Sequence, residues 1–153
     1  MFLPTGATEK LEYLLRQINL LLNHYTRTYL NERGLTIARF WVLSNLSLEQ
    51  PLTMGELQRR LLLAPGTITG LVDRLVEEGL VQRWRDEVDR RLVFLKLTPA
   101  GKKFLAEILQ LRYSILEKAL PDDNTDIKRL NRDLYTIFKN VRKLMGISGR
   151  GEE

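Results

Sequence analysis

The segment Leu80–Gly101, LVQRWRDEVDRRLVFLKLTPAG, constrains the fold of this chain more than any other. Two stretches of alternating character, Leu80–Arg85 and Leu92–Leu97, flank a short charged turn at Asp86–Arg91. Alternation with a period of two is typical of β-strands, and two such strands around a tight turn predict a β-hairpin. Because arginines lie on its arms and in its turn, the hairpin is a thin cationic ribbon.

A helix–turn–helix pattern precedes this hairpin. The string TMGE at Thr53–Glu56 has the form of a capping box, which begins a short helix. Pro65 suits the first turn of a second helix, and Gly79 suits its end. A helix fits the major groove of DNA, while a cationic ribbon reaches phosphates or the minor groove. The combination predicts a winged helix–turn–helix.

Three strings at these intervals carry a resemblance to a known family. They are TITGLVDRLVEEGLVQR at Thr67–Arg83, DEVDRR in the turn, and LTPAG at Leu97–Gly101. Together they resemble the MarR-type (multiple-antibiotic-resistance regulator) transcriptional regulators over nearly the whole chain. The resemblance implies a mainly α fold with a small β-hairpin wing, a homodimer, binding to DNA, and in many members a small-molecule effector.

Leucine-rich helical patterns flank the winged helix on both sides. Apolar residues recur at i, i+3, i+4 and i+7 over residues 9–31, and similar patterns follow Pro99. We therefore predict a single domain over 1–153, with dimerisation helices at 8–33 and 99–146 and the DNA-binding region at 35–98. A winged helix of that size cannot bury so much apolar surface alone, which favours a dimer. A helical cap folded onto a monomer is the alternative.

The chain has 153 residues, no cysteine and one histidine, His24. Without cysteine it has no disulfide, thiolate zinc site or cysteine nucleophile, and one imidazole makes a transition-metal site improbable. No apolar run has the length of a membrane span, and the first residues lack the pattern of a secretory signal. We expect a cytoplasmic protein with no cofactor, no metal and no membrane partner.

The net charge of +5 and the pI near 9.6 are compatible with a polyanionic partner. Within residues 51–99, however, eight Lys and Arg face seven Asp and Glu. The prediction of DNA binding therefore depends on where individual arginines project, and bulk charge adds little.

One face of the second helix lacks large aliphatic residues near its beginning, the part that enters a major groove. The predicted base- and phosphate-contacting residues of this face are Gly66, Thr67, Thr69, Gly70 and Arg74. A solvated face with threonines bonded to the local backbone is the alternative. Relatives commonly have a hydroxyl residue where this chain has Ala64 and Gly66, and an arginine where it has Gly70, so sequence specificity does not transfer from them.

In the wing, the predicted DNA contacts are Arg83, Arg85 and Arg90, with Arg90 in the minor groove. The resemblance implies that Arg91 pairs with Asp73 and fixes the wing against the recognition helix, while Asp89 orders the turn. Solvated surface arginines are the alternative.

Effectors of the resembled family bind between the dimerisation helices and the winged helix. The candidate ligand-binding residues here are Tyr25, Tyr29, Arg39 and Trp41. Core packing of these aromatic side chains is the favoured alternative, because aromatic stripes usually pack. His24 is more readily explained as an ordinary surface or core histidine than as a ligand.

We identify no catalytic residue, since the chain lacks a Ser/His/Asp or Cys/His set, a phosphate-binding glycine loop and an HExxH motif. The predicted function is a homodimeric, sequence-specific regulator of transcription that binds a palindromic double-stranded operator. We expect a repressor relieved by a small aromatic or anionic effector. A winged-helix adaptor that binds protein and no specific DNA is the alternative.

Overall fold

The computed structural model describes residues 5–120 and 126–147, so the turn cluster at 121–124 and the tail at 148–153 lie outside the described residues. The elements in chain order are α1 (Ala7–Asn31), α2 (Ile37–Ser44), β1 (Leu52–Thr53), α3 (Met54–Leu61), α4 (Pro65–Glu77), β2 (Val81–Arg85), β3 (Val93–Leu97), α5 (Pro99–Ala119) and α6 (Ile127–Leu144). The fold is mainly α with a small β-sheet, as the sequence predicts.

Side-chain caps determine where several helices begin. Thr53 Oγ1 accepts the backbone N–H of Glu56, whose carboxylate in turn accepts the backbone N–H of Thr53, so the predicted capping box is confirmed. These bonds, the Thr53 N–H first, hold the pKa of Glu56 below its usual value. Thr36 and Thr98 accept backbone N–H groups at the beginnings of α2 and α5 in the same way. Local sequence therefore fixes these boundaries.

The sheet has three strands in the order β1-β3-β2, all antiparallel to their neighbours. The predicted hairpin is formed by β2 and β3, with Val81 opposite Leu97 and Arg85 opposite Val93. The sequence analysis missed β1, whose two residues pair with the middle of β3. A strand that short shows no alternation, and it forms only because β3 offers a free edge.

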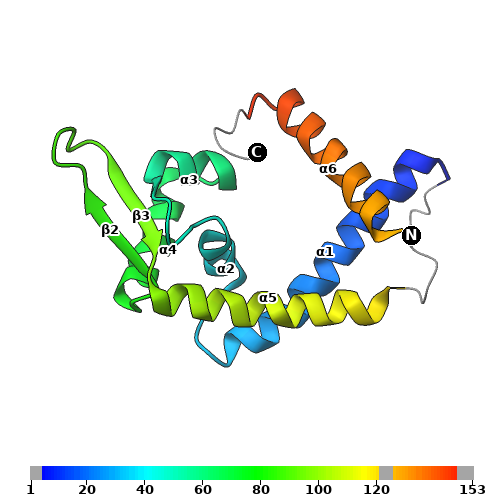
Figure 1. Ribbon diagram of the computed structural model, residues 1–153, viewed down its shortest axis with the longest axis horizontal. Helices are drawn as coiled ribbons and strands as arrows, with labels where there is room; N and C mark the ends of the chain where they lie inside the picture. The colour runs from blue at the N-terminus through cyan, green and yellow to red at the C-terminus, as the bar shows by residue number, and fades with distance from the viewer. Residues whose placement is uncertain (1–4, 121–125, 148–153) are drawn as a thin grey trace.

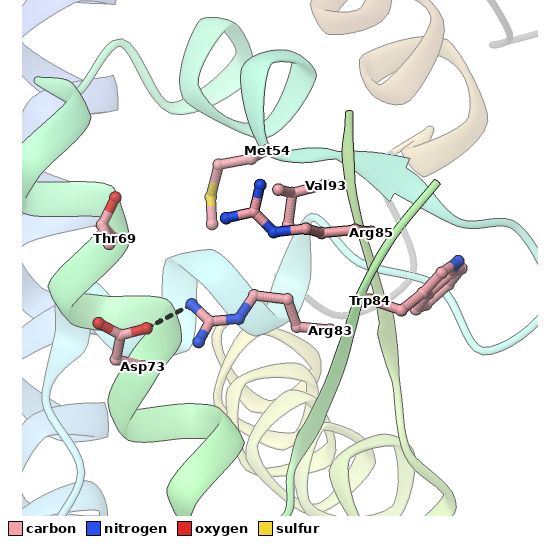
Figure 2. Close-up of a pocket in the computed structure, with 7 residues that line it drawn as sticks. All are labelled: Met54, Thr69, Asp73, Arg83, Trp84, Arg85 and Val93. Atoms are coloured by element: carbon pink, nitrogen blue, oxygen red, sulfur yellow. Dashed lines mark hydrogen bonds and ion pairs between the residues drawn. The ribbon is translucent and has the colours of Figure 1, made fainter. Parts of the chain in front are cut away.

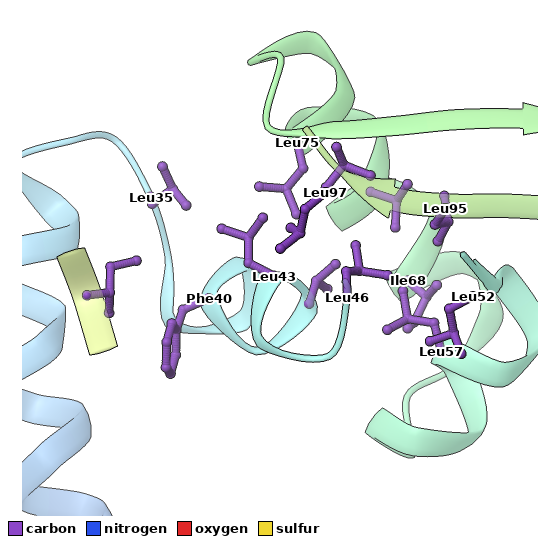
Figure 3. Packing of buried hydrophobic residues seen from close by; sticks show 14 of the residues in the cluster. Leu35, Phe40, Leu43, Leu46, Leu52, Leu57, Ile68, Leu75, Leu95 and Leu97 are labelled. Atoms are coloured by element: carbon purple, nitrogen blue, oxygen red, sulfur yellow. The ribbon is translucent and has the colours of Figure 1, made fainter. Parts of the chain in front are cut away.

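A single hydrophobic cluster joins the winged helix to the helices around it (Figure 3). Its fully buried members include Leu30 of α1, Leu43 of α2, Ile68 of α4, Leu95 of β3 and Ile108 of α5. Burying one such side chain contributes roughly 1.5–3 kcal/mol. The recognition-helix candidate α4 is therefore held by the same core as α1 and α5.

The junction between the hairpin and α5 explains the glycine of the LTPAG string. A Cβ added to Gly101 would lie 2.0 Å from the backbone carbonyl oxygen of Leu80. Thr98 Oγ1 donates to the Gly79 carbonyl and accepts the Gly101 N–H, at 2.7 and 3.0 Å. This close approach admits no side chain at position 101, so the beginning of α5 is fastened to the beginning of β2.

The ribbon has two ends of different character (Figure 1). The β2–β3 hairpin projects at one end beside α3 and α4, while α1, α6 and the far part of α5 lie at the other. No residue of α6 is buried, and α1 exposes a row of leucines and isoleucine. Among the described residues, no helix is both long and apolar enough to cross a bilayer.

Candidate nucleic-acid interface

Helix α4 is anchored on one side and open on the other. Ile68, Val72 and Leu75 are fully buried in the core. Pro65 occupies the first turn of α4, and Ala64 at the N-cap has no side chain that can accept a hydrogen bond. The first backbone N–H groups of α4 therefore have no side-chain acceptor at the N-cap. Such an end favours an anion.

The open side of α4 consists of the residues that the sequence analysis selected for DNA contact. All five are exposed: Gly66, Thr67, Thr69, Gly70 and Arg74. Nothing lies within 4 Å of a Cβ added to either glycine. The Thr69 hydroxyl donates to the Pro65 carbonyl at 3.0 Å, while Arg74 pairs with Glu77 at 3.2 Å with its side chain 71% exposed. The face is therefore small, flat and polar.

The wing has two chemically different faces, because side chains alternate along a strand. Arg83 and Arg85 lie opposite Leu95 and Val93 and share the face toward α4 (Figure 2). Trp84 points to the other face, where its ring stacks on Phe94 at a centroid distance of 5.8 Å. The aromatic pair stiffens the hairpin and leaves the cationic face free.

The expected pairing of Arg91 with Asp73 is wrong. Asp73 of α4 instead forms an ion pair with Arg83 of β2 (Figure 2). The physical reason is the hairpin register: Arg83 lies on the strand face toward α4, whereas Arg91 lies in the exposed turn. The wing is thus fixed against α4 by Arg83, one of the arginines for which the sequence predicts a DNA contact.

Two aspartates order the turn. Asp89 Oδ1 accepts the backbone N–H of Arg91 at 3.1 Å. Asp86 Oδ1 accepts the backbone N–H groups of Val88 and Asp89 at 2.8 and 2.7 Å. The sequence analysis does not include this role of Asp86, although an aspartate at the beginning of a turn commonly bonds the backbone in this way. Arg85 Nη1 donates to the Arg90 carbonyl at 3.1 Å, and the Arg90 side chain is exposed at the tip.

A groove of about 550 Å³ separates α4 from the wing. Its lining includes Thr69 and Asp73 from α4, Arg83 and Arg85 from β2, and Met54 at the beginning of α3 (Figure 2). Asp73 is paired with Arg83, so it does not neutralise Arg85. Among the described residues, the Arg85 guanidinium is bonded only to the neutral backbone carbonyl of Arg90. The groove can therefore accept an anionic strand.

The four ligand candidates do not form one site. Tyr25 and Tyr29 line a shallow pocket of about 250 Å³ with Thr28, Glu32 and Leu111, and this pocket contains neither Arg39 nor Trp41. Burial raises the pKa of Tyr29, whose hydroxyl lies 3.3 Å from Glu107.

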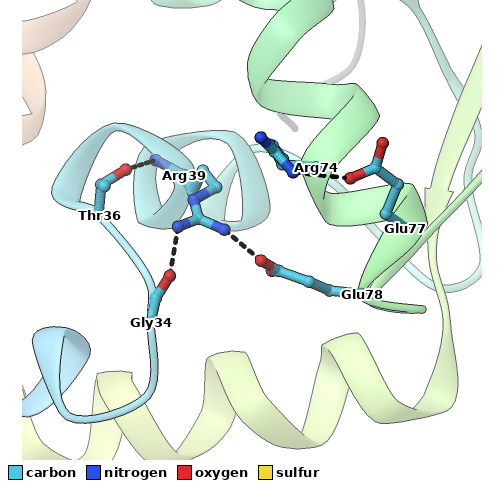
Figure 4. Close-up of polar contacts among 6 residues, drawn as sticks. All are labelled: Gly34, Thr36, Arg39, Arg74, Glu77 and Glu78. Carbon is cyan, nitrogen blue, oxygen red and sulfur yellow. Dashed lines mark hydrogen bonds and ion pairs between the residues drawn. The ribbon is translucent and has the colours of Figure 1, made fainter.

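Arg39 and Trp41 have structural contacts of their own. Arg39 bonds the Gly34 carbonyl and Glu78, which ties the α1–α2 loop to the end of α4 (Figure 4). Trp41 packs on Phe40 with ring centroids 5.0 Å apart. The bond between Arg39 and Glu78 joins residues 39 positions apart, so helical spacing alone could not find it. Trp41 and Phe40 are sequence neighbours, and their contact is the aromatic packing that the sequence analysis favours as the alternative.

The described residues contain no group of three or more His, Cys, Asp or Glu side chains that could hold a metal ion. The site consists of the exposed face of α4, which carries Arg74, and the arginines of the wing.

Comparison with known proteins gives a consistent result. The MarR family model matches residues 35–93. The HTH-type transcriptional regulator YsmB of Bacillus subtilis is 34% identical over 113 residues, covering 74% of this chain and 77% of that protein. The HTH-type transcriptional regulator MgrA of Staphylococcus aureus is 30% identical over 124 residues, covering 80% of this chain and 81% of its own length.

Solved structures extend the similarity to the fold. A mutant MarR from E. coli complexed with operator DNA aligns with a TM-score of 0.63 and 27% identity, over 87% of this chain and 99% of that one. The transcriptional regulator Tm0710 of Thermotoga maritima aligns with a TM-score of 0.62 and 30% identity, over 92% and 99%. These relatives are regulators of transcription rather than enzymes.

Proposed function

The chain belongs to the MarR family of transcriptional regulators, and we propose that it is a homodimer that binds a palindromic operator. In this proposal α4 enters the major groove with its exposed face, and the wing tip reaches the adjacent minor groove. The complex of a similar MarR with operator DNA supports it.

The observation that carries the proposal is the pairing of two surfaces on one side of the winged helix. The face of α4 around Thr67 and Gly70 is flat and has no packing partner of its own. Beside it the wing presents Arg85 and, at its tip, Arg90. Threonine offers a hydroxyl to a base edge or phosphate and a methyl to thymine, while arginine favours a narrow minor groove.

In the proposed complex the groove between α4 and the wing holds one DNA strand. One sugar–phosphate strand separates a major groove from the next minor groove, so it must pass between a recognition helix and its wing. Arg85 lines that groove and can donate to a phosphate. Arg83 is held by Asp73 and contributes to DNA binding through the wing's position.

The terminal helices support the dimer. Monomeric proteins seldom expose large contiguous apolar patches. Here the exposed apolar residues in and next to the terminal helices include Leu11, Leu14, Leu15, Ile18, Leu20, Leu21, Leu116, Leu120, Leu130, Ile137, Phe138, Val141 and Leu144. A second copy of the chain covers these faces and brings two α4 helices to one side of the DNA.

We assign repression to this dimer, since a protein on an operator excludes other proteins from the same DNA. The pocket of Tyr25 and Tyr29, where α1 meets α5, is the proposed site for an aromatic effector that relieves repression. Glu32 of this pocket forms an ion pair with Arg33 at 3.8 Å, and the Arg33 guanidinium lies over the Tyr29 ring, so the expected effector is a small aromatic or anionic molecule. The proposed place of action is the cytoplasm.

Selection of bound DNA from a random pool tests the proposal. We expect an enriched inverted repeat, with affinity that falls steeply as salt rises because bound phosphates release counterions. No enrichment, together with a shallow salt slope, would favour the protein-binding adaptor. Release of the enriched DNA by a small aromatic compound, abolished by Tyr25→Ala, tests the effector site.

A further inference from the structure

Arg112 of α5 is the one arginine among the described residues that touches both neighbouring helices α1 and α2. Its Nη1 donates to Asn23 Oδ1 at 3.2 Å and to Thr26 Oγ1 at 3.0 Å, both on α1. Its guanidinium carbon lies 5.3 Å from the ring centroid of Phe40 and 5.8 Å from that of Trp41, both on α2. One side chain therefore links three helices.

The contacts of Arg112 are unusual for a cation. No carboxylate forms an ion pair with it among the described residues, and burial lowers the pKa of its guanidinium. Neutral oxygens and two aromatic faces hold the charge instead. A planar guanidinium can donate in its plane while its faces lie against rings, and a lysine ammonium cannot do both.

The groups that Arg112 touches are themselves fixed. Thr26 is fully buried, and its hydroxyl also donates to the Leu22 carbonyl at 2.6 Å. Phe40 is buried in the core, only four residues after the N-cap of α2. A displaced Arg112 would leave Thr26 without its donor, so the contact defines one arrangement of the helices.

The position of this contact in the fold gives it a functional consequence. Helix α2 packs against α1 on one side and against α4 on the other (Figure 1). The α1–α5 pair belongs to the part of the molecule that the proposed dimer joins, whereas α4 belongs to the winged helix. A small rotation of α2 against α1 and α5 therefore displaces α4.

We propose that Arg112 is a positioning residue that sets the orientation of the winged helix on the α1–α5 pair, and through it the distance between the two recognition helices of the dimer. This inference rests on the proposed dimeric, DNA-binding function. DNA requires that distance to match one helical turn, about 34–36 Å.

A distance measurement without DNA tests the inference. The chain has no cysteine, so Thr67→Cys introduces a single spin-label site on the exposed face of α4. Pulsed electron resonance then gives the distance between the labels of the two protomers. We expect a narrow distribution in the full chain, a broadened or shifted one with Arg112→Met, and an intermediate one with Arg112→Lys. Lys103→Met, exposed on the same helix, is the matched control and leaves the distribution unchanged.

A second readout uses operators whose half-site spacing is changed by one or two base pairs. Arg112→Met should reduce the preference for the best spacing about 2- to 30-fold, the range over which single residues change coupling between sites. A residue that only stabilises the fold would lower the thermal midpoint and leave this preference unchanged. Arg112→Lys provides the comparison if Arg112→Met folds poorly.

The outcomes separate the two proposals. DNA binding with an unchanged distance distribution in both Arg112 variants overturns the role of Arg112 alone. A broadened distribution in a protein that binds no DNA supports the role of Arg112 and overturns the proposed function. The absence of any distance between protomers overturns both.

Discussion

Gly70 lies on the exposed face of α4, where glycine lowers helix stability and no neighbouring atom requires it. Glycine in a helix interior costs about 1 kcal/mol relative to alanine. In the proposed complex a flat surface at this position lets α4 approach DNA closely, because a Cβ there would point out of α4.

Gly70→Ala should therefore have opposite effects on two measurements. The free energy of unfolding should rise by up to about 1 kcal/mol, while operator affinity falls, because the added methyl group enters the interface. Urea denaturation and DNA titration measure the two quantities. Gly55→Ala in α3, where the new Cβ meets only Arg59 at 3.7 Å, is the control and leaves DNA affinity unchanged. Unchanged affinity for Gly70→Ala would show that DNA leaves room for a side chain here, as the arginine of relatives implies, and would contradict the close approach at this position.

The pair of Arg83 with Asp73 is partly solvated, with side chains 37% and 42% exposed. Ion pairs of this kind contribute about 0–1 kcal/mol. Its importance lies in the angle of the wing, not in overall stability.

Arg83→Ala should lower the free energy of unfolding by at most about 1 kcal/mol, and Arg91→Ala should leave it unchanged. Arg83→Ala should also weaken operator binding, because the wing loses its attachment to α4. Chemical denaturation measures the stability of both variants, and DNA titration measures their operator affinity. A larger loss of stability for Arg91→Ala would restore the pairing that the resemblance implied.

At the scale of elements, the sequence predicts what local chemistry determines. The capping box at Thr53 marks the beginning of α3, and the alternation of β2 and β3 gives the hairpin. The two-residue strand β1 has no local signal, since its pairing with β3 comes from tertiary structure.

The same distinction holds for the candidate site. The exposed face of α4 follows from helical spacing and could be predicted. The partners of Asp73 and Arg39 depend on how strands and helices pack, so the sequence did not reveal them. Arg112 escaped notice for the same reason, since its partners lie 86 and 89 residues away.

The junction of β2 and α5 gives a prediction for the LTPAG string. Gly101→Ala places a methyl group against the Leu80 carbonyl, where 2.0 Å is far inside a normal contact. Overpacking costs about 1–3 kcal/mol, and rigid backbone on one side favours the upper end. Thermal unfolding measures the loss. Lys103→Ala, at an exposed position of the same helix, is the control, and equal stability for Gly101→Ala would show that the junction is looser than described.

At the scale of the whole molecule, the apolar faces of α1 and α6 make a monomer improbable. Leu21 is 65% exposed, and α6 has no buried residue. The described residues leave these faces exposed, and in the proposed dimer a second chain packs on them.

Leu21→Asp should shift the dimer toward monomer, because the interface would bury an unpaired carboxylate. Sedimentation velocity at micromolar concentration measures the change, and operator affinity should fall with it. Lys10→Asp, an exposed polar position of α1, is the control and remains dimeric. A wild-type chain that sediments as a monomer would contradict the dimer.

In the proposed complex two α4 helices, related by a two-fold axis, meet successive major grooves while two wings reach the flanking minor grooves. Hydroxyl-radical footprinting on the selected operator tests it most directly. We expect two protected half-sites about 10 base pairs apart in an inverted repeat of roughly 16–20 base pairs. The minor-groove segments under Arg90 should be A·T-rich, because narrow A·T grooves attract arginine. Protection of a single half-site, or G·C-rich sequence under the wings, would rule out this two-fold arrangement on DNA.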